Sequence, residues 1–567
     1  MPKRLWVVAM SSLLAAGCRN ETRLAPLLPP CTAAGDTISL PLQGDYGFVD
    51  PGPIEGCMVF PANSAASPAE YLLVAQAATG TPNVSGSFIL QGAALAAAGM
   101  VPTRAPRIAA APLTAPERLH LLLRQNERDL AQPVGPSVAP RAAAPALAPV
   151  PDDSGSVRPF KVCGTDRDKA GNITCKVSNM VTVMATAQKV GTHLAIYVDN
   201  AAPSGGLTQQ DLDSLRAVFD GRLYAIDHSA FGTESDIDNN GMVRVLLTAR
   251  INMLCDTMTN SFVIGLFDGR DLIPKASGGT GNNGEVFYAI AADPTGASTC
   301  GTQVAATSVM RIVPPTFAHE FQHMISFNQH YFVNRGFQED LWLNEAMSHY
   351  AQERAGRSFL PDTVQFCNYS GDNLVNAHLY LQAPDAYFVI DTAGIGGIPE
   401  RGGYWLLLRF LIDQFSADTS VVAADAFTRT LDQTRLTGAA NLVAHTNNTP
   451  FPRLLSRWSL ANWVSDLPGF IAPDSLRYKS YAFRSAFPVF AGACPAGRRP
   501  PSTFPLVPEV GLGDAVNLVG TLRAGTGTYY RAQQTAGGSG FTLLFGDGSG
   551  RALRASLVPM LNVIRIQ

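Results

Sequence analysis

The chain has 567 residues, too many for a single hydrophobic core, so roughly two to four domains are expected. Its 46% hydrophobic and 15% charged residues are typical of a folded protein, and 51 glycines with 40 prolines indicate many turns and some linker. A formal net charge of -3 offers no broad basic surface and argues against nucleic acid as a partner.

The first 17 residues have the layout of a secretory signal peptide. Two basic residues precede an apolar run over residues 5–14, which is too short for a stable membrane span. The ending LLAAGC resembles a bacterial lipoprotein signal, in which Cys18 would become the lipidated first residue, although Ala15 stands where leucine is usual. A plain signal peptide with a chance cysteine is the alternative. Arg19 follows Cys18, in place of the aspartate that is associated with retention at the inner membrane. We therefore expect an exported bacterial lipoprotein at the outer membrane or cell surface, or otherwise a secreted protein.

Residues 18–100 are expected to form an N-terminal β domain. Short apolar runs such as YLLVAQAA and GSFILQG alternate with turn residues, which is typical of a small β-sandwich. Residues 101–158 are rich in alanine and proline and predict a linker. Within this linker PERLHLLLRQNERDLAQ predicts a short helix with leucines at helical spacing, Leu119, Leu122, Leu123 and Leu130. That helix either docks on a neighbouring domain or is a spacer.

Residues 159–480 have a mixed α and β pattern and are expected to form the central domain. HLAIYVD, VRVLLTA and GEVFYAIAA predict strands, whereas LTQQDLDSLRAVFDGRLYAID, LWLNEAMSHYAQERAG, YWLLLRFLIDQF and RLLSRWSLANWVSD predict helices. Residues 481–567 return to alternating strands such as GTYYRAQQ and GFTLLFG and predict a C-terminal β domain. The expected fold class is therefore α+β, with the central domain flanked by two small β-sandwich-like domains.

The stretch DIDNNG, residues 236–241, begins like a calcium-binding loop. Asp236, Asp238 and Asn240 precede a glycine, but the twelfth position, where an EF-hand has an acidic ligand, is Leu247. A Ca2+ site is one interpretation, and an acidic turn leading into a strand is the other.

The stretch FAHEFQHMISF, residues 317–327, carries two histidines with a glutamate directly after the first. Four residues is just over one helical turn, so His319 and His323 project from one face of a helix and can bind one Zn2+ ion at about 2.0–2.1 Å. Glu320 can accept a proton from a water molecule on the metal without being a ligand itself. Because HExxH also occurs by chance, a second signal is needed.

Glu345 supplies that signal, since a catalytic zinc takes three protein ligands. It follows His323 by 22 residues, which leaves room for the first helix to end and a loop to lead into a second helix. On the second helix Glu345 lies beside an apolar stripe, where a solvated flank residue is the alternative interpretation. Its position after HEFQH is better explained by a third metal ligand.

HEFQHMI followed by WLNEAMSHYA resembles the gluzincin metallopeptidases, of which thermolysin is the familiar member, and is similar to the hyicolysin-type secreted bacterial zinc metallopeptidases. The resemblance covers roughly residues 180–470. It implies that His319, His323 and Glu345 bind zinc, that Glu320 is the general base, and that the substrates are peptides or proteins. It also implies a sheet-edge strand that pairs with substrate, and GEVFYAI stands at about that place.

Other site residues follow less directly. Thermolysin has an aspartate four residues after its glutamate ligand, and His349 takes that place here. Asn344 and His349 are therefore candidates for hydrogen bonds that orient the metal ligands. The pattern does not identify the donor to the transition-state oxyanion, for which Tyr404 and Tyr387 are candidates.

Nine cysteines leave eight if Cys18 carries lipid, and eight can all pair in an oxidising compartment. Proximity in sequence suggests the pairs Cys31 with Cys57, Cys163 with Cys175, Cys255 with Cys300, and Cys367 with Cys494. Eight cysteines allow about 105 pairings, so proximity alone does not decide among them.

The sequence thus predicts an exported zinc metalloendopeptidase that touches the membrane only through an N-terminal lipid. One alternative is a catalytically silent, zinc-containing surface protein that binds or adheres on a peptidase fold. Another is an adhesin in which HEFQH is only structural. The oligomeric state is not predicted.

Overall fold

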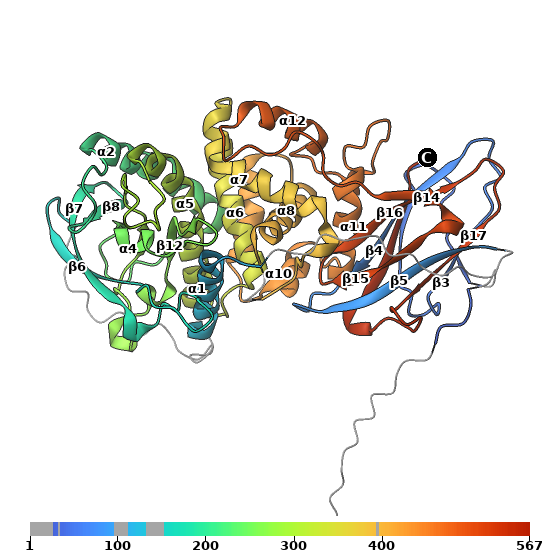
Figure 1. Ribbon diagram of the computed structural model, residues 1–567, viewed down its shortest axis with the longest axis horizontal. Helices are drawn as coiled ribbons and strands as arrows, with labels where there is room; N and C mark the ends of the chain where they lie inside the picture. Colours follow the sequence, from blue (N-terminus) through green and yellow to red (C-terminus); the bar gives the residue numbers. More distant parts are fainter. Residues whose placement is uncertain (1–26, 32–34, 96–111, 132–151, 393–395) are drawn as a thin grey trace, which may run out of the picture.

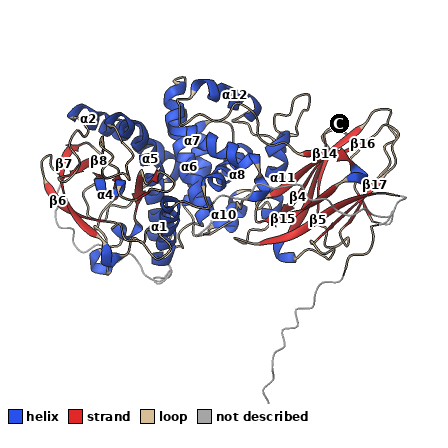
Figure 2. Cartoon of the chain, viewed as in Figure 1, coloured by secondary structure: helices blue, strands red, loops and turns tan. Residues whose placement is uncertain are grey.

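The computed structural model describes residues 27–31, 35–95, 112–131, 152–392 and 396–567. The expected signal peptide and Cys18 lie outside these residues. Figures 1 and 2 show strands at the two ends of the molecule and a block of helices between them, in agreement with an α+β fold. Among the described residues, no helix is both long and apolar enough to span a bilayer.

A six-stranded mixed sheet forms the end of the molecule drawn on the left of Figure 1. Its strand order is β12-β13-β9-β8-β7-β6, with β13, β9 and β8 parallel to one another. The strands are β6 (Val157–Val162), β7 (Val181–Val190), β8 (Leu194–Asp199), β9 (Val243–Leu247), β12 (Gly265–Phe267) and β13 (Val286–Ala289). β10 (Cys255–Asp256) and β11 (Ser261–Phe262) form a separate hairpin.

The edge strand differs from the one expected. GEVFYAI contains β13, which lies between β12 and β9, so the short strand β12 forms the edge. β13 is buried along its whole length, as expected for an inner strand with apolar residues on both faces.

Helices pack beside this sheet and form the centre of the molecule (Figure 1). α2 begins with a capping box at Thr208 and Asp211, in which each side chain accepts the other residue's backbone N–H. The helices that follow the linker are α2 (Gln209–Val218), α3 (Tyr224–Phe231), α4 (Ala249–Asn252), α5 (Ala306–Phe327), α6 (Leu341–Arg357), α7 (Thr363–Gln382), α8 (Ile398–Phe415), α9 (Val421–Asp432), α10 (Gly438–His445), α11 (Phe451–Val464) and α12 (Phe483–Ala493). One continuous core joins them to the sheet.

A two-sheet sandwich closes the other end of the molecule. Its sheets have the orders β1-β3-β17-β5-β15 and β14-β16-β4-β18-β2, and a core of its own lies between them. The strands are β1 (Asp36–Thr37), β2 (Tyr46–Val49), β3 (Cys57–Phe60), β4 (Ala69–Ala77), β5 (Ser85–Ala94), β14 (Glu509–Leu512), β15 (Asn517–Arg523), β16 (Gly527–Gln534), β17 (Phe541–Gly546) and β18 (Pro559–Arg565).

The sandwich corrects the expectation of two separate β domains. Strands from both ends of the chain alternate within the same sheets: β5 lies between β15 and β17, and β4 lies between β16 and β18. The outer face of one sheet rests on α11, where the Asn562 amide donates to the Ser459 hydroxyl at 3.0 Å.

The predicted linker helix is α1 (Ala115–Ala131), and it is docked rather than free. Thr114 and Glu117 form a reciprocal pair of side-chain to backbone hydrogen bonds at its start. Leu119 and Leu123 are 1% exposed and belong to the central core. The docking interpretation is therefore confirmed and the spacer interpretation is wrong.

Four disulfides join the eight described cysteines in the arrangement that proximity suggested. The pairs are Cys31–Cys57, Cys163–Cys175, Cys255–Cys300 and Cys367–Cys494.

Candidate metal centre

Helix α5 carries the two histidines of HEFQH. The helix contains Pro314 and Pro315, which cannot donate backbone hydrogen bonds, yet it continues to Phe327 with its second half fully buried. On this buried half the Nε2 atoms of His319 and His323 lie 3.2 Å apart. The predicted shared helix face is therefore present.

Helix α6 brings Glu345 to the same place. Its Oε2 lies 3.6 Å from Nε2 of His319, and its Oε1 lies 3.4 Å from Nε2 of His323. The Glu345 side chain is fully buried, so solvent does not compensate its charge. Two imidazole nitrogens and two oxygens of one carboxylate, carried by two helices, thus converge on one point.

The spacing of the two nitrogens from each other and from the nearest carboxylate oxygen fits a metal ion. Donors about 2.0–2.1 Å from one ion, at tetrahedral angles, lie about 3.3–3.4 Å from one another. The observed separations of 3.2, 3.4 and 3.6 Å bracket that value. Oε2 of Glu345 is buried and has no hydrogen-bond partner among the residues that the structure describes, which leaves a carboxylate oxygen to bind a cation.

Asn344 determines which nitrogen of His323 is available. Nδ1 of His323 lies 3.1 Å from the side-chain oxygen of Asn344, which can only accept a hydrogen bond. The ring proton therefore belongs on Nδ1, and the lone pair of Nε2 faces His319 and Glu345. Nε2 of His319 lies 3.2 Å from this lone pair, so one cation could bind both nitrogens.

The electrostatic surroundings also suit a cation. Burial lowers the pKa of His323 to about 3 and that of His319 well below its usual value, so both rings are neutral and can donate lone pairs. Burial would raise the pKa of Glu345, but the attraction of His120 and Arg401 outweighs it, and the pKa falls well below its usual value. The cluster therefore combines neutral imidazoles with an ionised carboxylate.

Glu320 lies next to the cluster and outside it. Its Oε2 accepts a hydrogen bond of 2.9 Å from the backbone N–H of Phe267 on the edge strand β12. Burial raises the pKa of Glu320 to about 7, against the attraction of Arg124. A carboxylate held by a backbone donor beside the metal position has the placement expected of a general base.

A fourth residue, His120 of helix α1, joins the cluster and was not predicted. Its Nε2 lies 2.6 Å from Oε1 of Glu345. Its ring centre lies 5.6 Å from that of His319 and 5.7 Å from that of His323. His120, His319, His323 and Glu345 place one potential ligand atom each within 4.8 Å of one another.

A second residue of α1 reaches the neighbouring strand. Arg124 is 1% exposed, and its Nη2 donates to the backbone oxygen of Phe267 at 2.9 Å. The same nitrogen lies 2.9 Å from Oε1 of Glu127 and 3.9 Å from Oε2 of Glu320. Residues of α1 thus contact the metal cluster, the candidate base and the edge strand together.

His349 lies close to His319, as its position in the sequence suggested. The two rings pack edge to face with their centres 5.0 Å apart. Nδ1 of His349 lies 2.9 Å from the side-chain oxygens of Gln352 and Asn373. Nε2 of His349 and Nδ1 of His319 are both buried, and neither has a hydrogen-bond partner among the described residues. His349 therefore supports His319 by packing.

Of the two tyrosine candidates, Tyr404 has its hydroxyl engaged, whereas the bond found for Tyr387 involves its backbone. The Tyr404 hydroxyl donates to the Asp391 carboxylate, so its proton is already used. The backbone oxygen of Tyr387 accepts a hydrogen bond from Thr526 of the β-sandwich region at 3.2 Å. Arg401 offers a different donor, because its Nε and Nη2 are buried without a hydrogen-bond partner among the described residues, and its charge acts on Glu320 and Glu345.

The calcium interpretation concerns a separate acidic group. Asp236, Asp238 and the buried Glu285 lie near one another, so a residue absent from the motif completes the group. Arg244 already compensates Asp238 with a 2.6 Å ion pair. The side chain of Asn240 accepts from the backbone N–H of Met242 as part of the turn, as in the acidic-turn interpretation.

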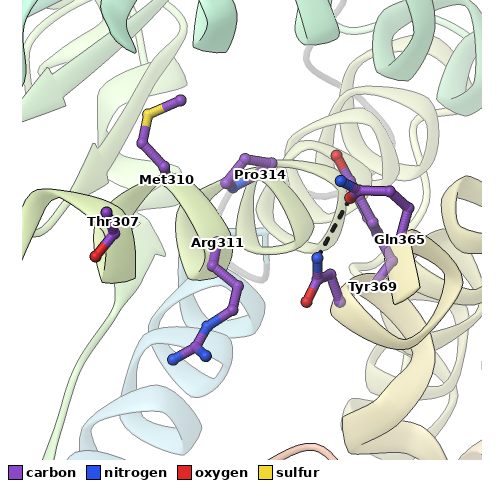
Figure 3. Close-up of a pocket in the computed structure, with 7 residues that line it drawn as sticks. Thr307, Met310, Arg311, Pro314, Gln365 and Tyr369 are labelled. Carbon is purple, nitrogen blue, oxygen red and sulfur yellow. Dashed lines mark hydrogen bonds between the residues drawn. The ribbon is translucent and has the colours of Figure 1, made fainter. Parts of the chain in front are cut away.

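A pocket of about 250 Å3 lies beside the first half of α5 and is shown in Figure 3. Met310, Arg311 and Pro314 line it from α5, and Gln365 and Tyr369 line it from α7. None of the four clustered residues belongs to this lining, so the pocket is separate from the candidate metal centre.

Comparison with known proteins gives one partial similarity. No family model matches the chain. The neutral metalloprotease ShpI of Staphylococcus hyicus is 27% identical to it over 175 residues. The match spans 30% of this chain and 37% of that protein, so it covers little more than a third of the relative. Together with the buried His–Glu cluster, this similarity supports a metalloprotease-like function that uses a metal ion.

Proposed function

We propose that the chain is an exported zinc metalloendopeptidase of the gluzincin type, similar to the hyicolysin-type enzymes. The observation that carries the proposal is the convergence of His319, His323 and Glu345 at 3.2–3.6 Å, with Glu320 directly beside them. Two imidazoles and one carboxylate form the ligand set of catalytic zinc in thermolysin-like enzymes.

His319, His323 and Glu345 would hold the ion. A zinc ion bound there supplies Lewis-acid polarisation of the substrate carbonyl and lowers the pKa of a bound water molecule. Glu320 accepts the proton of the attacking water as the new carbon–oxygen bond forms. It then delivers a proton to the amide nitrogen as the carbon–nitrogen bond breaks, which yields a carboxylic acid and an amine.

The edge strand β12 is the element that would bind the substrate backbone. A peptide that adds to a sheet edge is held by main-chain hydrogen bonds, with little dependence on its sequence. β12 ends at Phe267, whose N–H is bonded to Glu320, so a peptide along this edge would pass the candidate base. Unfolded proteins are therefore the expected substrates.

Arg401 is our candidate for stabilising the transition-state oxyanion, in place of Tyr404. Its guanidinium is planar and permanently charged, and two of its buried nitrogens have no hydrogen-bond partner in the part of the chain that the structure describes. Preorganised donors aimed at developing charge contribute strongly to catalysis.

Export and lipid attachment at Cys18 remain part of the proposal. Four disulfides are consistent with an oxidising compartment. Labelling with palmitate and partition into detergent test the anchor. A product cleaved elsewhere and free of lipid would contradict it.

The test of the function is elemental analysis of the purified full chain together with a casein cleavage assay. Because His120 stands at the cluster in this structure, the assay includes the His120→Ala protein. About one zinc per chain and Glu320-dependent cleavage are expected. A chain that holds zinc but cleaves nothing in either form would favour the silent binding protein.

A further inference from the structure

We infer that helix α1 is a built-in inhibitor of the proposed peptidase, with His120 acting as a removable fourth ligand of the metal. The inference rests on the proposed function and adds a regulatory element to the same site. Two contacts made by α1 and the way in which the helix is held carry it.

The first contact is at the metal position. His120 lies 2.6 Å from Glu345 and almost equally far from the rings of His319 and His323, so it caps the site rather than flanking one ligand. Catalytic zinc sites keep one position open beside three protein ligands, whereas structural sites are closed by four. The 2.6 Å contact is a hydrogen bond, shorter than the about 3.3–3.4 Å between two ligands of one ion, so His120 would move away from Oε1 of Glu345 as it completes a closed four-ligand site.

The second contact is at the substrate edge. The carbonyl oxygen of Phe267 is the backbone acceptor at the end of β12, and Arg124 donates to it at 2.9 Å. The guanidinium of Arg124 also approaches Glu320, at 3.9 Å. A peptide added to β12 at this point would have to displace Arg124 from Phe267.

The third feature is the way α1 is held. Leu119 and Leu123 place one side of the helix in the core, and Arg128 forms a 2.7 Å ion pair with Asp340, the residue just before α6. His120 and Arg124 are four residues apart, so they project from adjoining positions on one face. A single docked helix therefore delivers both blocking side chains.

A purely structural four-ligand site is the competing explanation, and the position of Glu320 argues against it. A structural site has no use for a carboxylate that is buried at 2% exposure beside the ligands and held by the edge strand. The same residue has an evident role once His120 leaves.

The test compares the full-length protein with His120→Ala, which keeps high helix propensity in α1. Gln125→Ala is the matched control, because among the described residues the half-buried Gln125 side chain bonds only to the exposed Asp129. Each protein is loaded with Co2+, and its visible spectrum is recorded with and without acetohydroxamate, a small probe that binds metals. Casein cleavage is measured with the zinc-loaded proteins.

We expect His120→Ala to keep one metal ion, to change the cobalt spectrum, and to bind acetohydroxamate when the parent and Gln125→Ala proteins do not. Its kcat/KM for casein should exceed that of the parent by at least about tenfold. In the parent only the fraction of molecules in which His120 has left the metal is active, and His120→Ala removes this requirement. Arg124→Met, which leaves every proposed ligand in place, should give a smaller increase.

Other outcomes separate the two claims. Equal cleavage and equal probe binding by parent and His120→Ala would overturn the inhibitor and leave the peptidase standing. Loss of metal from His120→Ala would overturn the inhibitor in favour of a structural four-ligand site. Probe binding only in His120→Ala, with no cleavage by any protein, would support the fourth ligand and contradict the peptidase.

Discussion

The side-chain oxygen of Asn344 lies 3.1 Å from Nδ1 of His323, and Asn344 immediately precedes Glu345 on α6. One short segment therefore fixes the tautomer of one candidate ligand and supplies another. This coupling explains how two helices joined by a loop can present a defined set of lone pairs.

Asn344→Leu tests that relationship. Leucine fills a similar volume but cannot accept the Nδ1 proton, so the lone pair of His323 is no longer held toward the metal. Zinc affinity should fall by about 10–100-fold, as for other partners of metal-bound histidines. Competition with a chromogenic chelator measures it, with Asn368→Leu on α7 as the control. Unchanged affinity would mean that Asn344 does not set the tautomer.

Glu345→Gln tests the third ligand. The amide keeps the size of the side chain but removes the negative charge. Because the two imidazole ligands are neutral, Glu345 supplies the only negative charge among the three proposed ligands. The loss of zinc affinity should exceed the about 10–100-fold cost of losing a supporting partner. Glu339 and Glu353 are poor controls because both are buried and hydrogen-bonded, so the exposed Glu509→Gln is used. Retention of zinc by Glu345→Gln would place the third ligand elsewhere.

Arg401→Gln tests the oxyanion candidate. Loss of one preorganised donor typically costs about 10²–10³ in kcat, whereas zinc content should not change because Arg401 is not in the ligand cluster. The comparison is made in the His120→Ala background, with the more exposed Arg477→Gln as control. A change confined to KM would assign Arg401 to substrate binding instead.

Asp227→Asn tests an electrostatic feature remote from the cluster. Asp227 of α3 is fully buried, and neither of its carboxylate oxygens has a hydrogen-bond partner within the described ranges of the chain. Burial raises its pKa well above the usual value despite the nearby Arg354. The folded protein therefore binds the proton more tightly than the unfolded chain does.

The stability contributed by protonated Asp227 is complete below the unfolded pKa of about 3.9 and is lost as pH rises through the higher folded pKa. Asparagine is neutral at every pH, so Asp227→Asn should gain melting temperature relative to the parent as pH is raised from 4 toward 8. Scanning calorimetry at several pH values measures this, with the 92% exposed Asp474→Asn as control. A constant difference across the range would show that Asp227 is ionised throughout.

The sequence predicts the site residues that lie close together along the chain and misses the one that is distant. His319, Glu320 and His323 share one helix, and helical geometry alone places them on one face. Glu345 follows on the next helix, so chain order and a short loop bring it near. His120 is 225 residues from Glu345 and lies in a stretch whose alanine and proline content predicts a linker. Its one signal is that His120 and Arg124 repeat the four-residue spacing of Leu119 and Leu123.

For the fold, too, the sequence predicts local elements but not which distant elements pack together. The strand patterns of β16 and β17 are visible in the sequence, and the structure confirms them. Their partners are not visible, because alternation fixes which face of a strand is buried but not which distant strand lies beside it. β12 has only three residues, too few for a periodic pattern, so the sequence favours the longer β13 as the substrate edge.

The measurement that tests the central claim most directly is zinc stoichiometry beside casein cleavage for Glu320→Gln and His323→Ala, both in the His120→Ala protein. Glu320→Gln should hold about one zinc, because Glu320 is not in the ligand cluster, while cleavage falls by about 10²–10⁴-fold. His323→Ala should lose zinc and cleavage together. A Glu320→Gln protein that cleaves casein at the parental rate would contradict the account, because HEFQH would then not be the catalytic centre.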